Sequence, residues 1–516
     1  YFPRFFHPDP TVKRQSGFLM PKFESSSSLG DSISVPYFKV ISTNKDLTFT
    51  PKIYNDSEGL FQSEFRQENK KSSHILDLGI KKNKENTKSH FFSNSFAKFD
   101  LGYFENSELE VNIETTSNDN YLKSHKVKSG ITNNNSLLNS FLIFRGNNQD
   151  FNFEAKVESY EDLTKDKSSD KYEYIFPSYE FSKRITSSYD GDYEIRSRGN
   201  YKNYNTNIFE KVLINDLEFS SNPKITPSGF VNKFSVLLKN ITSEADNSSN
   251  YKNKFSSENY GSIFYDMSYP LKNEGKFFDN FFTVKGSLMY SPNSNKDLKT
   301  LDRKIDINNI FTQNRLSLDD TVEGGQSLTL GGEYSLKSKE SGIDIIKAGL
   351  ATVLRDDEET NLPTKSTLNN KGSDFIGSFL FEPNKNFKFD YNFSIDSDFE
   401  SSNYNSVKTD ISVNKFVTSF EFLQEDDEMG SESFLSNETS YNFNDSYSLK
   451  YRTRRNKKTD FTEFYNLIYE YKNDCLTASI QYNKDYYSDN ELKPTEELFF
   501  SISIVPLATL NTPSVR

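Results

Sequence analysis

The most chemically varied stretch of the sequence runs from residue 308 to residue 325 and reads Asn-Asn-Ile-Phe-Thr-Gln-Asn-Arg-Leu-Ser-Leu-Asp-Asp-Thr-Val-Glu-Gly-Gly. One arginine, three carboxylates and several amides could form ion pairs with one another or bind an anionic group. Alternating apolar residues precede the stretch, and a second alternating run, Ser327 to Lys337, follows it, so we expect a turn between two β-strands. Most such turns only connect strands, so the first interpretation of this stretch is that it is a connector without a further function.

No other group of residues has the spacing of a catalytic or metal site. The histidines are scattered and have no obvious serine or carboxylate partner: His7, His74, His90 and His125. Acidic runs at 356–359 and 425–428 fall in expected loops, where solvated carboxylates explain them better than bound divalent cations. The sequence therefore indicates no active site, no metal and no cofactor, and we predict that the protein is not an enzyme.

Composition favours an all-β protein. Only 34% of residues are apolar and the mean hydropathy is −0.74, yet aromatic residues reach 15%, with 47 Phe and 30 Tyr. A disordered chain lacks aromatic residues, and a conventional core of this size needs more aliphatic ones. The net charge of −12 argues against a nucleic-acid partner, which would require a basic surface.

Apolar and polar residues alternate with the period of a β-strand. Leu109, Val111 and Ile113 are separated by polar residues, and the same pattern runs from Phe387 to Ile395. Such a segment has one apolar face and one polar face. The apolar face could pack inside a soluble sandwich or contact lipid around a barrel.

Strand length favours the barrel. Strand follows strand from about Ser32 to about Leu507, giving roughly 26 strands, most of them ~10 to 14 residues long, as tilted membrane-spanning strands are. No apolar run reaches the ~18 to 20 residues of a spanning helix. We predict a large antiparallel transmembrane β-barrel. In the second half short turns alternate with long loops, whereas Ser117–Asn135 is long where this alternation requires a short turn.

The amino-terminal segment Tyr1–Glu24 is basic and rich in proline, and it does not alternate. We expect residues 1–30 to be a linker from an upstream domain that is missing from this chain, together with the export signal. Residues 31–516 are then the barrel domain.

Three separated stretches resemble one family, the LPS-assembly outer-membrane protein LptD. The first is His7–Pro21 followed by Val35-Pro36-Tyr37-Phe38 and Leu47-Thr48-Phe49-Thr50-Pro51; the second is Asn309–Gly325; the third is Asp474-Cys475 with Leu498-Phe499-Phe500. The stretches occur in the family's order, and the resemblance extends over nearly the whole chain.

This resemblance implies a function in the outer membrane of a Gram-negative bacterium. Members of the family carry a periplasmic jelly-roll domain before a barrel of about 26 strands. They receive lipopolysaccharide from a periplasmic LptA-like bridge and deliver it to the outer leaflet. An LptE-like lipoprotein plug sits in the lumen, and the lipid leaves between the first and last strands.

Prolines mark the expected exit. A seam that opens exposes backbone donors and acceptors to lipid, so it must be weakly paired from the start. Proline weakens pairing because it lacks the N–H of a ladder bond. Pro36 and Pro51 match positions of the family's lateral gate, and Pro506 joins them from its place in the last strand. Tolerated prolines near strand ends are the alternative.

The stretch that opened this section matches the family at seven positions: Asn309, Phe311, Asn314, Arg315, Asp320, Glu323 and Gly325. It departs at Leu318, where the family tends to have Gly, and at Thr321, where it tends to have Arg. The loss of that arginine puts a shared ion-pair geometry in doubt. We expect the loop to close the barrel mouth, and contact between Arg315 and substrate phosphates or sugars is the alternative.

The single cysteine, Cys475, allows no disulfide within this chain. The family often has a cysteine here that pairs with one in the periplasmic domain; a lone buried thiol is the alternative.

Two other functions are compatible with a large β-protein. A substrate-specific channel or receptor-type barrel would need a plug domain or an inward constriction loop, and a secreted adhesion protein would show a repeat of constant period. The sequence shows neither feature.

Overall fold

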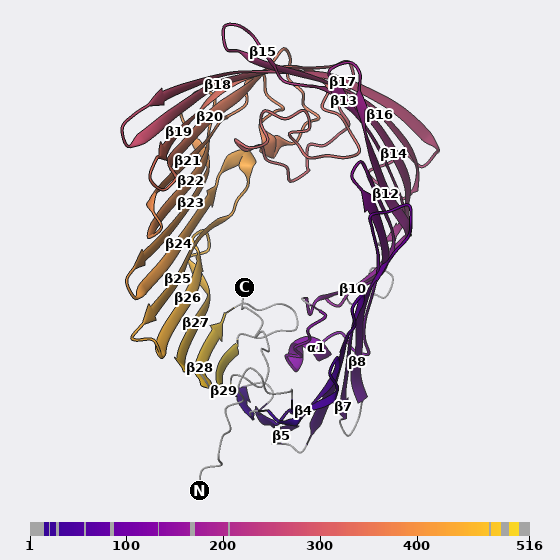
Figure 1. The fold of residues 1–516 in the computed structure, drawn as a ribbon, viewed down its shortest axis with the longest axis vertical. Coiled ribbons are helices and arrows are strands. Elements are labelled where there is room, and N and C mark those ends of the chain that lie inside the picture. The colour runs from indigo at the N-terminus through magenta and orange to yellow at the C-terminus, as the bar shows by residue number, and fades with distance from the viewer. Residues whose placement is uncertain are drawn as a thin grey trace.

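The computed structural model describes residues 15–504, except for residues 20, 27–29, 56–57, 83–86, 133, 166–170, 205–206, 474–475 and 487–494. The described residues form one antiparallel sheet that closes on itself through pairing of β2 (Lys22–Ser26) with β29 (Thr495–Ile504). Figure 1 shows this sheet as a ring around an open lumen.

The remaining elements follow one another along the chain. The strands are β1 (Gly17–Phe18), β3 (Gly30–Ser34), β4 (Tyr37–Ser42), β5 (Lys45–Tyr54), β6 (Gly59–Glu68), β7 (Ser72–Lys82), β8 (Thr87–Phe99), β9 (Asn106–Thr116), β10 (Leu137–Asn148), β11 (Phe151–Asp162), β12 (Tyr172–Ser187), β13 (Gly191–Tyr204), β14 (Ile208–Ser221), β15 (Lys224–Ile225), β16 (Val231–Asp246), β17 (Ser256–Glu274), β18 (Phe278–Ser291), β19 (Gly325–Ser338), β20 (Asp344–Arg355), β21 (Phe375–Asn384), β22 (Phe387–Ile395), β23 (Ser402–Val413), β24 (Phe416–Glu425), β25 (Ser433–Asn442), β26 (Tyr447–Asn456), β27 (Phe461–Lys472) and β28 (Leu476–Asp485). The helical elements are α1 (Tyr121–Ser124), η1 (Thr364–Ser366) and η2 (Asp427–Met429). Within the described ranges, no helix has the length and apolar character to cross a membrane.

The ring contains 26 strands when the described pairings are followed around it. β1 pairs with β4 and β2 pairs with β3, so these four pieces form one interrupted hairpin, while β15 is a short addition beside β16. The predicted fold class, an all-β antiparallel barrel of about 26 strands, is confirmed.

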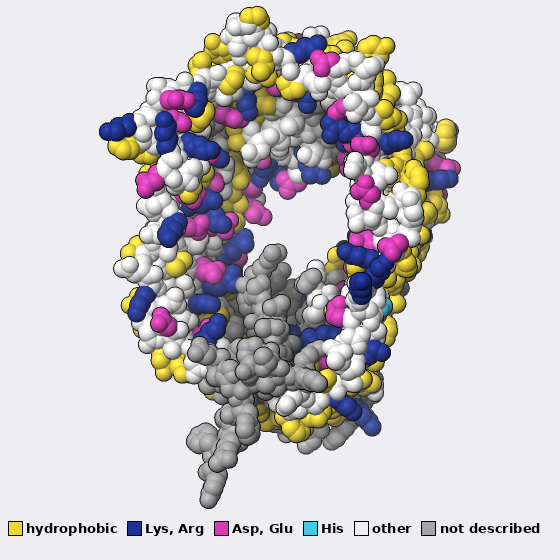
Figure 2. Space-filling model, in the orientation of Figure 1, with side chains coloured by type: hydrophobic (Ala, Val, Ile, Leu, Met, Phe, Trp, Pro, Cys, Tyr) yellow, Lys and Arg dark blue, Asp and Glu magenta, His cyan; other side chains and the backbone are white. Residues whose placement is uncertain are grey.

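The alternation seen in the sequence separates the two faces of the wall. On β18, Phe282, Val284 and Leu288 point outward and are about half exposed, whereas Ser287 is buried on the inner side. Figure 2 shows hydrophobic side chains along the outer rim and many charged ones around the opening. An apolar exterior and a polar lumen are the arrangement that a lipid environment requires of a barrel.

Successive connections lie at alternating ends of the barrel. Short turns such as 414–415 share one end, and long loops such as 292–324 and 356–374 share the other. The connection 117–136 lies at the long-loop end, so the expectation that it breaks the alternation was wrong. The strand count from sequence began near Ser32 and omitted the strand at 17–26.

The expected boundary near residue 30 lies inside the sheet, because β1 and β2 already pair with their neighbours. Lys22, Phe23 and Glu24 continue the alternation for too few residues to distinguish them from the proline-rich segment before them.

Two hydrophobic clusters lie on the luminal side of the wall. One, which we call the mouth cluster, joins the loops 292–324 and 356–374; its members are Leu298, Ile305, Ile310, Leu316, Leu318, Ala351, Val353, Leu362, Leu368, Ile376 and Met429. The other, the α1 cluster, consists of Tyr54, Leu60, Phe92, Tyr121, Leu122, Val127, Leu138 and Leu163. The long loops therefore fold into the lumen, as Figure 1 shows for the orange loops near β13, β17 and β20.

Candidate functional sites at the mouth and the seam

The loop 292–324 is held in the lumen by apolar side chains at its centre. Ile310 and Leu316 are buried against Leu362 and Leu368 of the neighbouring loop, and Phe311 packs at the edge of this cluster. Leu318, at a position where the family tends to have glycine, is also buried there. The departure from the family pattern thus adds apolar contact.

A buried ion cluster fixes the end of the loop. Arg315 binds Glu323 through both ends of its guanidinium group, with 2.8 Å between Nε and Oε2, and it donates to the Thr329 and Ser327 hydroxyls at 3.1 and 2.9 Å. Arg355, at the end of β20, forms a second ion pair with Glu323 and donates to the Gly324 carbonyl. Burial opposes ionisation of Glu323, but the two arginines hold its pKa below the ordinary value.

Glycine is required where the loop enters β19. Gly325 has φ +86°, in the left-handed region, and a Cβ there would lie 2.8 Å from Nη2 of Arg355. Arg315, Glu323 and Gly325 are therefore brought together, as their place in one motif suggests.

Asp319 and Asp320 bind outside this ion cluster. Lys296 Nζ and the Tyr251 hydroxyl each lie 2.9 Å from Oδ2 of Asp320, and Arg198 Nη1 lies 2.8 Å from Oδ1 of Asp319. Burial raises the pKa of Asp320, but Lys296 and Tyr251 outweigh it, so this pKa lies below the ordinary value. These contacts join the loop to the wall strand β13 and to the connection between β16 and β17.

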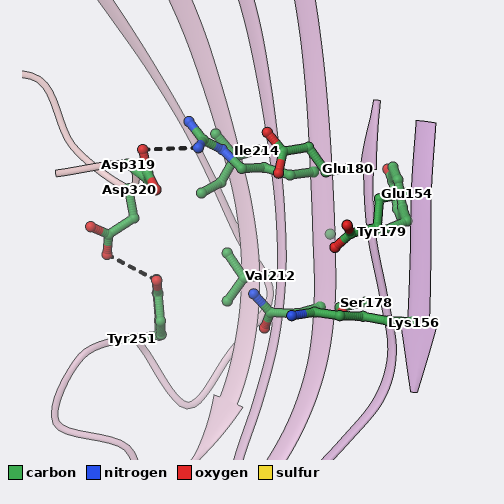
Figure 3. Close-up of a pocket in the computed structure, with 13 residues that line it drawn as sticks. Glu154, Lys156, Ser178, Tyr179, Glu180, Val212, Ile214, Tyr251, Asp319 and Asp320 are labelled. Atoms are coloured by element: carbon green, nitrogen blue, oxygen red, sulfur yellow. Dashed lines mark hydrogen bonds and ion pairs between the residues drawn. The ribbon is translucent and has the colours of Figure 1, made fainter. Parts of the chain in front are cut away.

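The same contacts border a cleft of about 340 Å³ between the loop and the strands β11 to β14. Figure 3 shows Asp319 and Asp320 on the loop side and Glu154, Lys156 and Glu180 on the wall side. Its charges are mixed, and Arg198 is already paired with Asp319, so the cleft shows no preference for an anionic ligand.

The remaining motif residues shape the turn itself. The Asn309 side chain accepts the Asp306 N–H at 2.8 Å, and Asn314 exchanges two hydrogen bonds with the backbone of Leu318, at 3.0 and 3.1 Å. Asn309 and Phe311 lie away from the ion cluster. All seven predicted residues therefore have structural contacts within the loop or with the wall.

Sequence reasoning missed the cations outside the motif that pair with its carboxylates. Arg355 forms an ion pair with Glu323, and Lys296 forms one with Asp320. The one available signal was the position of Arg355 at the end of an alternating strand, directly before an acidic run.

The seam between β2 and β29 is short, because β2 has five residues. Five residue pairs join β2 to β29 among the described residues, from Lys22↔Ser501 to Ser26↔Glu497, whereas ten join β28 to β29. β1, which continues the same strand, pairs with β4 on its other side.

Two predicted gate prolines lie in the strands next to this seam, Pro36 between β3 and β4 and Pro51 within β5. The pairings Ser34↔Lys52 and Tyr37↔Phe49 keep one register, so Val35 lies opposite Pro51 and Pro36 lies opposite Thr50. Their carbonyls still accept hydrogen bonds, from Leu19 to Pro36 at 2.7 Å and from Val35 to Pro51 at 3.2 Å. Each proline lacks the N–H that would donate a second backbone hydrogen bond to the neighbouring strand. Pro36 belongs to the second strand of the ring, between β3 and β4, because the strand at 17–26 precedes it.

Pro506 and Cys475 lie outside the described residues. Pro21, which directly precedes β2, was not predicted as a gate residue, although the register between the first two strands shifts by one residue between Phe18↔Tyr37 and Lys22↔Ser34.

The family model and the curated relatives agree on one family. The family model for LptD, described as LPS transport system D, matches residues 87–429, which is more than half of the chain. The chain is 46% identical over 69 residues to the LPS-assembly protein LptD of Shewanella sp. (strain ANA-3), covering 12% of this chain and 9% of that protein. It is also 46% identical over 54 residues to the protein of that name from Paraburkholderia xenovorans (strain LB400), covering 10% and 7%.

Solved structures give only distant similarity. The FrpB iron transporter from Neisseria meningitidis (F5-1 variant, apoprotein form) aligns over 95% of this chain and 81% of its own, with 8% identity and a TM-score of 0.35. The siderophore receptor PirA from Pseudomonas aeruginosa aligns over 96% and 81%, with 8% identity and a TM-score of 0.31. Scores this low support no functional argument.

The sequence alignments with the curated relatives thus span a small part of their length, while the family model spans most of the barrel. The chain belongs to the LptD family, LPS transport system D, whose members are transport and assembly barrels of the Gram-negative outer membrane and not enzymes.

Proposed function

We propose that this chain is the barrel of a translocon that inserts lipopolysaccharide into the outer leaflet through a lateral gate between β2 and β29. The observation that carries the proposal is the placement of Pro36 and Pro51 on adjacent strands at one level, beside the short junction of five residue pairs between β2 and β29. Family membership supplies the substrate class.

The physical requirement is a seam that opens at low cost. Each backbone group left unpaired in lipid costs several kcal/mol, so an ordinary seam of ten paired residues stays shut. Five pairs, next to strands that lack rungs, reduce that cost and allow the edge to bend. An amphiphile could then keep its sugars in the polar lumen while its acyl chains enter the membrane.

Pro36→Ala and Pro51→Ala, alone and together, test this proposal. Each alanine restores an N–H, so the first strands become stiffer and delivery of lipopolysaccharide to the cell surface should fall, most in the double variant. Pro270→Ala is the matched control, because Pro270 lies within β17, away from the seam. Unchanged surface delivery in the double variant removes the basis of the gate.

A second role, closure of the mouth, belongs to the loop 292–324. Its support is the burial of Arg315, whose guanidinium is occupied by Glu323, Thr329 and Ser327, which favours a structural role over contact with phosphates or sugars. Deletion of Leu318–Val322 should make cells permeable to large antibiotics. Permeability equal to that of the wild type would count against closure.

Two protein partners follow from the family assignment. An LptE-like lipoprotein would occupy the lumen, which Figure 2 shows as an opening rimmed by charged side chains. An LptA-like bridge would reach the barrel through a domain before residue 1. Affinity purification of the full-length protein tests both partners, and a non-reducing gel of that protein tests a disulfide from Cys475 to the preceding domain. A mobility unchanged by reduction would favour the lone thiol.

A further inference from the structure

The connection 117–136 folds into the lumen and is anchored on the first half of the barrel. Tyr121, Leu122 and Val127 are buried against Phe92 and Leu60 in the α1 cluster. Figure 1 shows α1 inside the ring, beside the wall near β8 and β10.

Polar contacts add to this anchoring. The His125 imidazole lies 3.1 Å from the Tyr54 hydroxyl, and the Tyr121 hydroxyl lies 3.2 Å from Nδ1 of His90. Gln62 donates to the Lys128 carbonyl at 2.8 Å. The segment is therefore joined to β5, β6 and β8, all on the β2 side of the seam.

One side chain of this segment reaches the other side of the seam. Lys126, at φ +49°, forms an ion pair with Glu497 of β29, and its ammonium group lies 4.8 Å from the centre of the Phe499 ring. The Glu497 side chain is 3% exposed and that of Lys126 is 40% exposed. A buried carboxylate depends on its cation, because an unpaired charge there is costly.

A second ion pair holds β2 to its own side. Lys52 of β5 pairs with Glu24 of β2, across the intervening β3. If the seam opens, β2 stays with β5 and with the segment 117–136, while β29 moves away. The Lys126–Glu497 pair must then break, whereas the Lys52–Glu24 pair can persist.

We propose that the segment 117–136 is a luminal latch on the seam, closed by the Lys126–Glu497 ion pair and released when an anionic headgroup takes Lys126 from Glu497. The latch rests on the proposed lateral gate. Its release is consistent with the local charges, since Lys52 and Lys128 each lie close enough to Lys22 to interact with it electrostatically. A phosphate entering this region meets several exposed cations, Lys22, Lys126 and Lys128, and among them Lys126 pairs with Glu497 of the last strand.

Hydrogen–deuterium exchange of the full-length protein in nanodiscs tests the latch without any transport step. Lys126→Ala and Glu497→Gln should each speed amide exchange in 22–26 and 495–504 by about tenfold, with β16 to β18 unchanged. Lys123→Ala is the matched control, because it removes a charge from the same segment and leaves the ion pair intact. The charge swap Lys126→Glu with Glu497→Lys should restore slow exchange.

The release step uses purified lipid A with its phosphates and the same lipid after dephosphorylation. The phosphorylated lipid should speed seam exchange in the wild type and add nothing in Lys126→Ala, and the dephosphorylated lipid should have no effect. Equal effects of the two lipids overturn the release by anions, and seam exchange unchanged in Lys126→Ala and Glu497→Gln overturns the latch. Neither result bears on the gate itself, which fails only if the Pro36 and Pro51 variants deliver lipopolysaccharide normally.

Discussion

Arg355 and Glu323 form an ion pair that joins the end of β20 to the last turn of the loop 292–324. Glu323 is also held by Arg315, so one buried carboxylate lies between two guanidinium groups from different parts of the chain. The loop is thereby fixed to the barrel wall at its second end, next to the position where it becomes β19.

Replacement of Arg355 by alanine should release this end of the loop. Removing one partner of a buried ion pair costs about 3–5 kcal/mol, because the remaining charge stays buried. We expect faster amide exchange in 310–325 and sensitivity to large antibiotics. Arg303→Ala removes an exposed cation from the same loop and should change neither measurement. An unaltered exchange rate in the Arg355 variant would mean that Arg315 alone holds the loop.

Gly325→Ala should have a smaller effect of the same kind. The left-handed backbone at this residue costs about 1–2 kcal/mol for a residue with a Cβ, and the added methyl would press on Arg355. Gly286→Ala is the control, since its nearest neighbour would lie 3.7 Å from the new Cβ. Thermal unfolding and antibiotic sensitivity report the two effects; equal stability of the two variants would contradict the assigned strain.

Leu122→Ala should detach the segment 117–136 from the wall. Leu122 is fully buried in the α1 cluster, and truncation of a buried leucine costs about 2–5 kcal/mol. Trypsin should then cleave after Lys123, Lys126 or Lys128 faster than in the wild type. Leu122→Met, which nearly conserves the volume, should stay resistant. Cleavage at the wild-type rate in the alanine variant would show that the polar contacts suffice.

Acid should loosen the same segment. Burial, aided by Lys81, Lys88 and Lys52, lowers the pKa of His125 from 6.5 to about 4. The docked segment therefore prefers the neutral imidazole, so its stability is complete above pH 6.5 and falls as the pH drops toward 4. The loss at pH 5 is on the order of 1–2 kcal/mol. Amide hydrogen exchange in the segment 117–136 at pH 7.5 and at pH 5 measures this loss of stability. His125→Asn should remove the difference in stability between the two pH values.

Much of the barrel could be predicted because its strands have one lipid-facing side. The alternation of Phe387 to Ile395 reappears as β22, and the strand number follows from such patterns. Residues 17–26 were not predicted as a strand, because the two short pieces separated by Pro21 have too few alternating positions.

The seven motif residues of the mouth loop could be identified from the sequence, but their partners could not. Nothing in the spacing of Glu323 and Arg355 indicates a contact, since it depends on how the loop folds back into the lumen. The same holds for Lys126 and Glu497, which come together only when the ring closes. Contacts between distant segments are set by the closed barrel and leave no local pattern.

The closed ring also has an uneven topology. Around the described sheet, each neighbouring pair comes from consecutive parts of the chain except β2 and β29, which come from its two ends. Pairing β2 with β29 closes a loop that contains nearly the whole chain. The entropic cost of this pairing is therefore the largest among the strand pairs, and it should form last during assembly. Once the hairpins have formed, they keep both edges in place. In the proposed gate, the seam would then part and rejoin as a local event, and the barrel would not have to unfold between one passage and the next.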